Sequence, residues 1–249
     1  MTIKIAYGKH PSQFGVLQRP EGPGNCPVVV SIHGGFWQSK YSLEENTPLA
    51  EDLARRGYAT WNIEYRRIGE EGGAWPGTFH DVVSAVNHLN QLKDTYQLDL
   101  SKVVVIGHSA GGHLALLLGS FLNVKESPLV VPIKGIISLA GVTDPDKMLQ
   151  IHTERGIASP VTAFLGHSME ELPIASPIEL LPLNVDQVLI HGELDRHVPV
   201  TLSVEYHRRA RELGDSVRLI RLPEAEHFMV VDPTSSAWKA VTDSLEGLI

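Results

Sequence analysis

The sequence predicts an α/β fold in which a mostly parallel central sheet is covered by helices on both faces. Short apolar, β-branched runs alternate with helical patterns along most of the 249 residues, as a doubly wound sheet requires. One such run, 103–106, leads through small residues directly into an apolar helical run at 112–118. Because no repeat or interdomain linker interrupts the pattern, we expect a single domain over residues 1–249.

The elements follow in order from the amino end. The first buried strand covers 28–32. In the helix after it, we expect Thr47 to supply a capping hydroxyl and Pro48 to occupy the first helical position. Gly57 is expected to end that helix. The same apolar patterns give the remaining elements. They are strands at 58–65, 103–106, 133–139, 188–190 and 217–222, and helices at 79–93, 112–118, 200–213 and 235–248.

The start of the helix at 79–93 allows two interpretations. Thr78, with Asp81 three residues later, fits a capping box. Asp81 also fits an ion pair with Arg66 or Arg67 in the preceding loop. Both interpretations are structural, so these residues are assigned no catalytic role.

Residues 107–111, Gly-His-Ser-Ala-Gly, join the strand at 103–106 to the helix at 112–118. Such a sharp strand-to-helix turn holds the central serine in a strained conformation at the helix N-terminus. A Cβ two positions before or after the serine would collide with the neighbouring strand or helix, which accounts for the two glycines. The pattern therefore predicts that Ser109 is a nucleophile.

A serine hydroxyl needs a base to take its proton and an acid to orient that base. Asp195 follows the strand at 188–190 and His227 follows the strand at 217–222, each in a loop at the carboxyl end of its strand. We predict a catalytic triad of Ser109, Asp195 and His227, with Glu193 as the rival carboxylate. Neutral His227 would accept the serine proton, with an apparent pKa of roughly 6 to 7.5.

Residues 33–37, His-Gly-Gly-Phe-Trp, follow the first buried strand. Acyl transfer develops negative charge on a carbonyl oxygen, and fixed backbone N–H groups stabilise it. We assign this oxyanion hole to the amides of Gly35, Phe36 and Ala110. His33 is interpreted as a structural residue that braces the loop by hydrogen bonds.

Aromatic residues beside the predicted site are candidates for the substrate pocket. Trp37 and Phe228 are assigned to substrate binding, where they would line an acyl or aryl group, and packing beneath the loop is the alternative. The chain has 12 histidines, but none has the spacing of a zinc motif. We therefore expect no metal and no cofactor. His113 is expected to be a packed core residue and His197 an exposed loop residue.

Together these motifs resemble the α/β-hydrolases of the esterase/lipase group. Within that group, residues 33–37 and 107–113 are most similar to enzymes with a His-Gly-Gly-x-Trp loop: kynurenine formamidase (arylformamidase), small bacterial carboxylesterases, and acetyl or feruloyl esterases. The resemblance covers about residues 25–235. Phe36 stands where lipases of the hormone-sensitive type carry a third glycine, so the chain departs from that branch.

The resemblance implies a serine hydrolase that acts on small carboxylic esters, with arylformamide hydrolysis as the alternative. A hydrolase-fold protein that binds a small ligand without turnover is the alternative from another class, although such proteins usually lose a triad member. Segment 141–183, which contains only short helical patterns, would form a short cap after the sixth strand. A short cap favours small or slender substrates or a shallow, open pocket.

Composition restricts the partners and the compartment. A formal net charge of −8 and an isoelectric point near 5.8 argue against a nucleic-acid or basic membrane-binding surface. The amino end lacks the apolar stretch of a signal peptide, and Cys26 is the single cysteine, so we expect a cytoplasmic protein without an internal disulfide. The expected partner is a small-molecule ester or amide, and homo-oligomerisation stays open.

Overall fold

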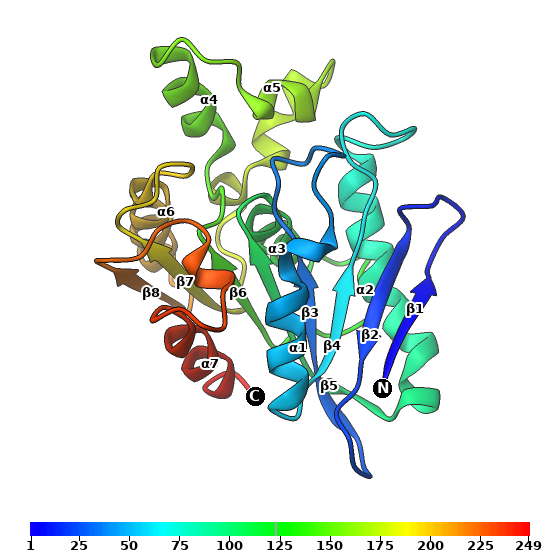
Figure 1. Cartoon of the computed structure of the whole chain (residues 1–249). Helices are drawn as coiled ribbons and strands as arrows, with labels where there is room; N and C mark the ends of the chain where they lie inside the picture. The colour runs from blue at the N-terminus through cyan, green and yellow to red at the C-terminus, as the bar shows by residue number, and fades with distance from the viewer. Residues whose placement is uncertain (123) are drawn as a thin grey trace.

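The computed structural model describes residues 1–122 and 124–249, and these residues form an eight-stranded sheet between two layers of helices (Figure 1). The strand order is β1-β2-β4-β3-β5-β6-β7-β8. β1 pairs with β2 and β2 with β4 in antiparallel fashion, and every later pair is parallel. The predicted mostly parallel sheet is confirmed. The strands are β1 (Thr2–Ala6), β2 (Phe14–Gln18), β3 (Cys26–Ile32), β4 (Ala59–Ile63), β5 (Leu98–His108), β6 (Gly135–Leu139), β7 (Asp186–Gly192) and β8 (Val217–Leu222).

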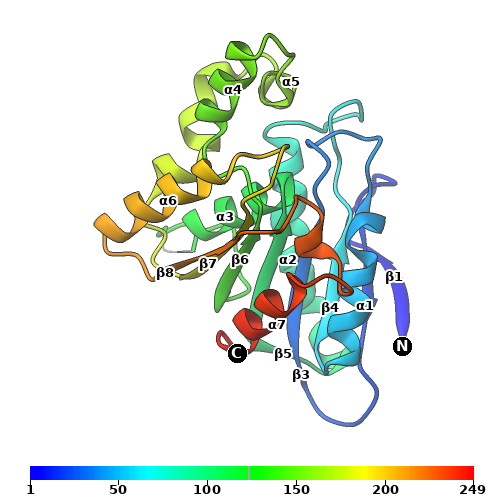
Figure 2. The ribbon, with the colours of Figure 1, turned by 60° about the vertical axis from the view of Figure 1, so that its left-hand side comes forward.

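The helices lie on both faces of this sheet (Figure 2). Buried side chains of α2, α3 and α6 pack with one face, and those of α1 and α7 pack with the other. Helices therefore cover the central strands on both faces, which is why β3 and β5 carry continuous β-branched runs. The helices are α1 (Thr47–Arg55), α2 (Gly77–Tyr96), α3 (Ala110–Ser120), α4 (Pro145–Glu154), α5 (Pro160–Leu165), α6 (Val200–Glu212) and α7 (Trp238–Glu246), with short 3-10 turns η1 (Leu43–Asn46), η2 (Met169–Ala175), η3 (Pro177–Leu180) and η4 (Met229–Val231).

The two amino-terminal strands were not among the predicted elements. β1 is a mostly exposed edge strand, and its five residues mix apolar and polar side chains. β2 pairs with β1 on one side and with β4 on the other. Strands this short give little periodic signal, and only the sheet edge offered by β4 selects their conformation.

Two local predictions about helix starts are corrected. Thr47 is the first residue of α1, and its hydroxyl donates to the carbonyl of Leu43 instead of capping the helix. Asp81 is not part of a capping box, because its buried carboxylate accepts hydrogen bonds from Arg66 and Gln13. The alternative interpretation, an ion pair with Arg66, is the one observed, at 2.7 Å.

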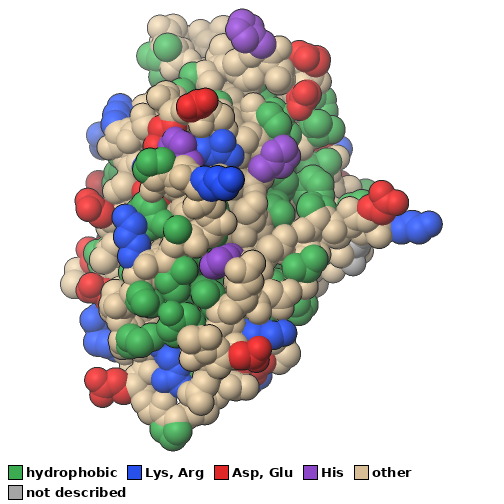
Figure 3. Space-filling model, turned by 90° about the vertical axis from the view of Figure 1, so that its right-hand side faces the viewer, with side chains coloured by type: hydrophobic (Ala, Val, Ile, Leu, Met, Phe, Trp, Pro, Cys, Tyr) green, Lys and Arg blue, Asp and Glu red, His purple; other side chains and the backbone are tan. Residues whose placement is uncertain are grey.

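Segment 141–183 folds into α4, α5, η2 and η3 and lies beyond the carboxyl ends of the parallel strands, at the top of Figure 1. Among the described residues, no helix is both long and apolar enough to cross a bilayer. On the face that carries β1 and α2, charged side chains of both signs are scattered among small hydrophobic patches (Figure 3).

Candidate active site

Ser109 lies between the end of β5 and the start of α3 in a strained backbone conformation, with φ 53° and ψ −116°. A non-glycine residue rarely adopts this conformation, and the surrounding structure must enforce it. A Cβ on Gly107 would lie 2.1 Å from the carbonyl oxygen of Gly111, and one on Gly111 would lie 2.1 Å from that of Ile32. Both glycines are thus required by backbone contacts, as the sequence pattern predicts.

Asp195 and His227 are brought together by the loops after β7 and β8. His227 Nδ1 donates to Asp195 Oδ2 at 2.6 Å, and the Asp195 side chain is fully buried. The other carboxylate oxygen accepts from the backbone N–H groups of His197 and Val198, at 2.8 and 2.9 Å. This arrangement leaves His227 Nε2 as the ring nitrogen that can accept a proton.

His191, at the end of β7, is a further neighbour of this carboxylate that the sequence analysis did not single out. His191 Nε2 lies 3.2 Å from Asp195 Oδ2, and its Nδ1 pairs with the Ser203 hydroxyl at 2.8 Å. The ring is completely buried. Asp195 is therefore held from two imidazoles and two backbone amides, and its orientation toward His227 is fixed.

The loop after β3 has three successive residues with positive φ: Gly35 at 96°, Phe36 at 55° and Trp37 at 57°. A Cβ on Gly35 would lie 2.3 Å from the Cβ of Tyr41, so the loop can take this path only with glycine there. His33 braces the loop, since its Nδ1 contacts the carbonyl of Gly34 and its Nε2 contacts Glu64, both at 2.8 Å. The bracing role predicted for His33 is confirmed.

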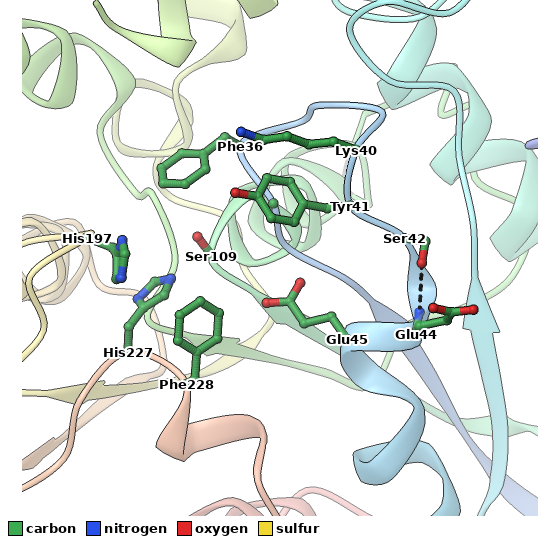
Figure 4. A pocket seen from close by; sticks show the side chains of 11 residues that line it. Phe36, Lys40, Tyr41, Ser42, Glu44, Glu45, Ser109, His197, His227 and Phe228 are labelled. Atoms are coloured by element: carbon green, nitrogen blue, oxygen red, sulfur yellow. Dashed lines mark hydrogen bonds between the residues drawn. The ribbon is translucent and has the colours of Figure 1, made fainter. Parts of the chain in front are cut away.

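These elements surround a cavity of about 310 Å³ (Figure 4). Ser109 and His227 both face it, and Phe36 and Phe228 form part of its wall. The Ser109 hydroxyl makes no hydrogen bond to the described residues; in structures without substrate, catalytic hydrogen bonds are often long and tighten only when substrate binds. The full lining comprises Gly35, Phe36, Lys40, Tyr41, Ser42, Glu44, Glu45, Ser109, His197, His227 and Phe228.

A family model described as BD-FAE matches residues 16–209, more than three quarters of the chain. The chain belongs to the BD-FAE family. The match includes Ser109, Asp195 and residues 33–37, the predicted oxyanion loop, and it ends before His227.

Other comparisons place this BD-FAE protein among α/β-hydrolases. It is 26% identical over 238 residues to the esterase LipC of Mycobacterium tuberculosis (strain ATCC 25618 / H37Rv), covering 90% of this chain and 59% of LipC. It is 24% identical over 212 residues to kynurenine formamidase of Salmo salar, covering 84% of this chain and 68% of that protein. The chain thus spans less than two thirds of LipC.

The fold is shared with a solved structure titled as a truncated form of carbohydrate esterase from gut microbiota. The TM-score is 0.85 at 21% identity, and the alignment covers 100% of this chain and 96% of that one. The α/β-hydrolase fold that the motifs predict is confirmed for this BD-FAE protein.

Burial sets the protonation behaviour of the candidate base. The pKa of His227 is lowered to about 4, chiefly by burial; the hydrogen bond and charge of Asp195 oppose this shift, and the charges of His108 and His197 add to it. Burial alone would raise the pKa of Asp195, but hydrogen bonds from His191 and His227 hold it well below its usual range. The pKa of roughly 6 to 7.5 expected for His227 from its residue type is therefore corrected downward.

Of the two aromatic residues assigned to substrate binding, Phe228 lines the cavity and Trp37 does not. Phe228 is half exposed, at 53%, and lines the cavity. Trp37 does not line it: the indole is 2% exposed and stacks on Phe164 of α5, with ring centroids 4.6 Å apart. The positive φ at Trp37 turns its side chain away from the cavity, so packing beneath the loop is the observed alternative.

Three further expectations concern neighbouring residues. His113 is fully buried and its Nε2 contacts the carbonyl of Ala175 at 2.7 Å, as predicted for a core residue. His197 is exposed, as predicted, yet it lines the cavity and its ring lies 5.0 Å from that of His227. Segment 141–183, the expected cap, contributes no residue to the lining of this cavity.

Sequence analysis also missed the residues at 40–45. Lys40, Tyr41 and Glu45 reach the cavity from the turn before α1, opposite His227 (Figure 4). No catalytic motif covers this stretch, and its residues meet the site only because β3 and η1 are adjacent in space. The signal that could have drawn attention is Glu45 itself, an acidic residue a short distance after the oxyanion loop.

Proposed function

We propose that this protein is a serine hydrolase that cleaves small carboxylic esters through an acyl-enzyme. The observation that carries the proposal is the convergence of a strained Ser109 and an Asp195-oriented His227 on one cavity. Strain of this kind and a buried carboxylate–imidazole pair are costly to maintain, and together they have a clear use in nucleophilic catalysis. Similarity to LipC supports ester hydrolysis.

In the first step His227 Nε2 takes the hydroxyl proton of Ser109 as the serine oxygen attacks the ester carbonyl. The amides of Gly35, Phe36 and Ala110 stabilise the oxyanion of the tetrahedral intermediate. His227 then gives the proton to the leaving alcohol, and the acyl group stays on Ser109. In the second step His227 activates a water molecule, which releases the carboxylic acid and restores the serine hydroxyl.

Asp195 has an electrostatic and orienting role in this scheme. Its bond to Nδ1–H keeps the proton on that nitrogen, which leaves Nε2 free to accept the serine proton. The carboxylate also stabilises the imidazolium that forms during each step. Because hydrogen bonds hold the pKa of Asp195 low, it stays ionised over the working pH range.

Hydrolysis of an aryl formamide is the second candidate. The similarity to kynurenine formamidase of Salmo salar supports it, as does the small cavity beside Ser109, since a formyl group is the smallest acyl group. The same residues would act in the same order, with an aromatic amine as the leaving group. Comparing kcat/KM for short nitrophenyl esters with that for N-formylkynurenine decides between the two candidates.

The nucleophile is tested with a fluorophosphonate probe, which reacts with activated serines. The purified protein should be modified at Ser109, and Ser109→Ala should abolish both labelling and turnover while leaving the melting temperature within about 2 °C. Ser42→Ala, which removes a hydroxyl at the rim of the same cavity, is the labelling control. A folded protein that stays unlabelled, or that is labelled at another serine, would overturn the proposal and favour a ligand-binding role.

A further inference from the structure

A second carboxylate–imidazole pair lies directly beside the first. Glu45 Oε1 is 2.8 Å from His108 Nδ1, and Glu45 Oε2 accepts a hydrogen bond from the backbone N–H of Gly34 at 2.9 Å. His108 Nε2 in turn contacts the carbonyl oxygen of His227 at 3.0 Å. A continuous chain of hydrogen bonds therefore runs from the oxyanion loop through Glu45 and His108 to the backbone of the candidate base.

This chain passes close to Ser109. A Cβ on Gly34 would lie 3.0 Å from the Cβ of Ser109 and 3.1 Å from His108 Nδ1, so the backbone of Gly34 runs close beside both residues. The His108 side chain is completely buried, and the Glu45 side chain is 17% exposed. The rings of His108 and His227 have centroids 4.6 Å apart. Nothing in the hydrolytic scheme above uses either Glu45 or His108.

The bridge engages both ring nitrogens of His108. Both ring nitrogens face oxygen atoms that can only accept, a carboxylate on one side and a backbone carbonyl on the other. The bond from His108 to Glu45 involves an ionised carboxylate and is therefore a charge-assisted one, stronger than a neutral bond.

We propose that Glu45 and His108 form a positioning bridge that holds the oxyanion loop and the loop of His227 at a fixed separation on either side of Ser109. The inference rests on the proposed hydrolase function. Glu45 acts on Gly34 and so sets the path of the loop that carries the Gly35 and Phe36 amides. His108 acts on the backbone of His227 and so sets the height of its ring above the cavity.

The electrostatics of the pair agree with this role. Burial raises the pKa of Glu45, but the hydrogen bond and charge of His108, the charge of His33 and the hydrogen bond from Gly34 together outweigh that effect, and the net shift is downward. The charge of His108 also contributes to the lowered pKa of His227. The groups that face His108 are Glu45 from η1, Gly34 from the oxyanion loop, and the rings of His227 and Phe228 from the loop after β8.

The bridge is tested with Glu45→Gln and His108→Asn, alone and together, in the full chain. A carboxamide cannot accept from both Gly34 and His108 with its two terminal atoms, so one end of the bridge opens. We expect kcat on a short nitrophenyl ester to fall by about 10- to 100-fold in each single variant, with KM changed by less than about threefold. The double variant should be no slower than the slower single one, because both break the same bridge.

The pH profile gives a readout that a purely structural residue would not move. Replacement of the His108 ring by Asn removes one cause of the lowered pKa of His227, so the acid limb of kcat/KM should move to higher pH in His108→Asn. Glu51→Gln is the matched control, since it removes the same charge from an exposed position on α1. It should leave kcat, KM and the acid limb unchanged.

Glu45→Asp supplies a second variant in case Glu45→Gln does not fold. It keeps the charge but shortens the side chain by one methylene, and it should also reduce kcat. Wild-type protein that turns over ester while these variants match it in kcat and acid limb would overturn the bridge alone. Wild-type protein without turnover or Ser109 labelling would overturn the proposed function, and with it the catalytic purpose of the bridge.

Discussion

Replacing Asp195 by Asn gives the sharpest test of the predicted triad, because the contacts of each carboxylate oxygen are known. The oxygen that accepts from the backbone N–H groups of His197 and Val198 can be reproduced by the asparagine carbonyl. The amide nitrogen then takes the place of Oδ2, which faces His227 Nδ1 and His191 Nε2. The asparagine NH₂ group, which is a hydrogen-bond donor, would then face the N–H groups of His227 and His191.

Two consequences follow from that exchange. His227 can satisfy the asparagine amide only by moving its proton to Nε2, and this tautomer cannot accept the proton of Ser109. We expect kcat to fall by about 10⁴-fold, equivalent to about 5.5 kcal/mol in the activation barrier. His191 Nε2 keeps the backbone carbonyl of Val198 as an acceptor at 2.9 Å, but the asparagine amide would place a second donor beside it in a fully buried position, which should destabilise the fold by about 1–3 kcal/mol.

The assay is steady-state hydrolysis of a short nitrophenyl ester together with the rate of fluorophosphonate labelling and the midpoint of denaturant unfolding. Glu193→Gln is the matched control. Glu193 lies two residues earlier in the same loop and pairs with Arg221 at 3.0 Å on the surface, so its loss should change kcat by less than about twofold. A severe effect of Glu193→Gln with a small effect of Asp195→Asn would refute the assignment of the acid.

Two further predictions concern pH and substrate size. Only neutral His227 can act as the base, and its pKa is lowered to about 4, chiefly by burial. We therefore expect kcat/KM to be high at neutral pH and to fall only when the pH drops to about 4, where His227 becomes protonated. An acid limb at about pH 6.5 or above would contradict the effect of burial. A cavity of about 310 Å³ is at the small end for ligand pockets, so formyl, acetyl and butyryl esters of one alcohol should exceed octanoyl esters in kcat/KM, and a steady increase to long chains would indicate a deep acyl tunnel.

Motifs with fixed spacing could be predicted because their geometry is local. Ser109 follows its strand and precedes its helix within a few residues, and the flanking glycines have steric reasons that hold in any protein with this turn. Asp195 and His227 could be named because the carboxyl ends of parallel strands meet at one edge of a sheet. The order of the strands themselves was not predicted, and neither were β1 and β2.

Contacts between distant segments could not be predicted in the same way. Trp37 directly follows Gly35 and Phe36, the predicted oxyanion-hole residues, but its ring stacks on Phe164, 127 positions later, where the loop turns through three successive positive φ values. Glu45 lies in no motif, and His108 occupies a variable position of the Gly-x-Ser-x-Gly turn. Their bond exists only because the fold brings η1 to the end of β5, 63 positions later in the chain. The lowered pKa of His227 likewise depends on burial that its neighbours in the chain do not supply.

The sequence by itself determined the layered α/β architecture, the strand-to-helix turn at Ser109 and the candidate triad, because hydrophobic periodicity and short-range steric constraints depend on neighbouring residues. The tertiary structure alone decided which aromatic side chains line the cavity, how the candidate base is buried and how Glu45 joins the oxyanion loop to His108. These features depend on the distances between segments far apart in the chain. Packing of the whole core sets those distances, and no local pattern records them.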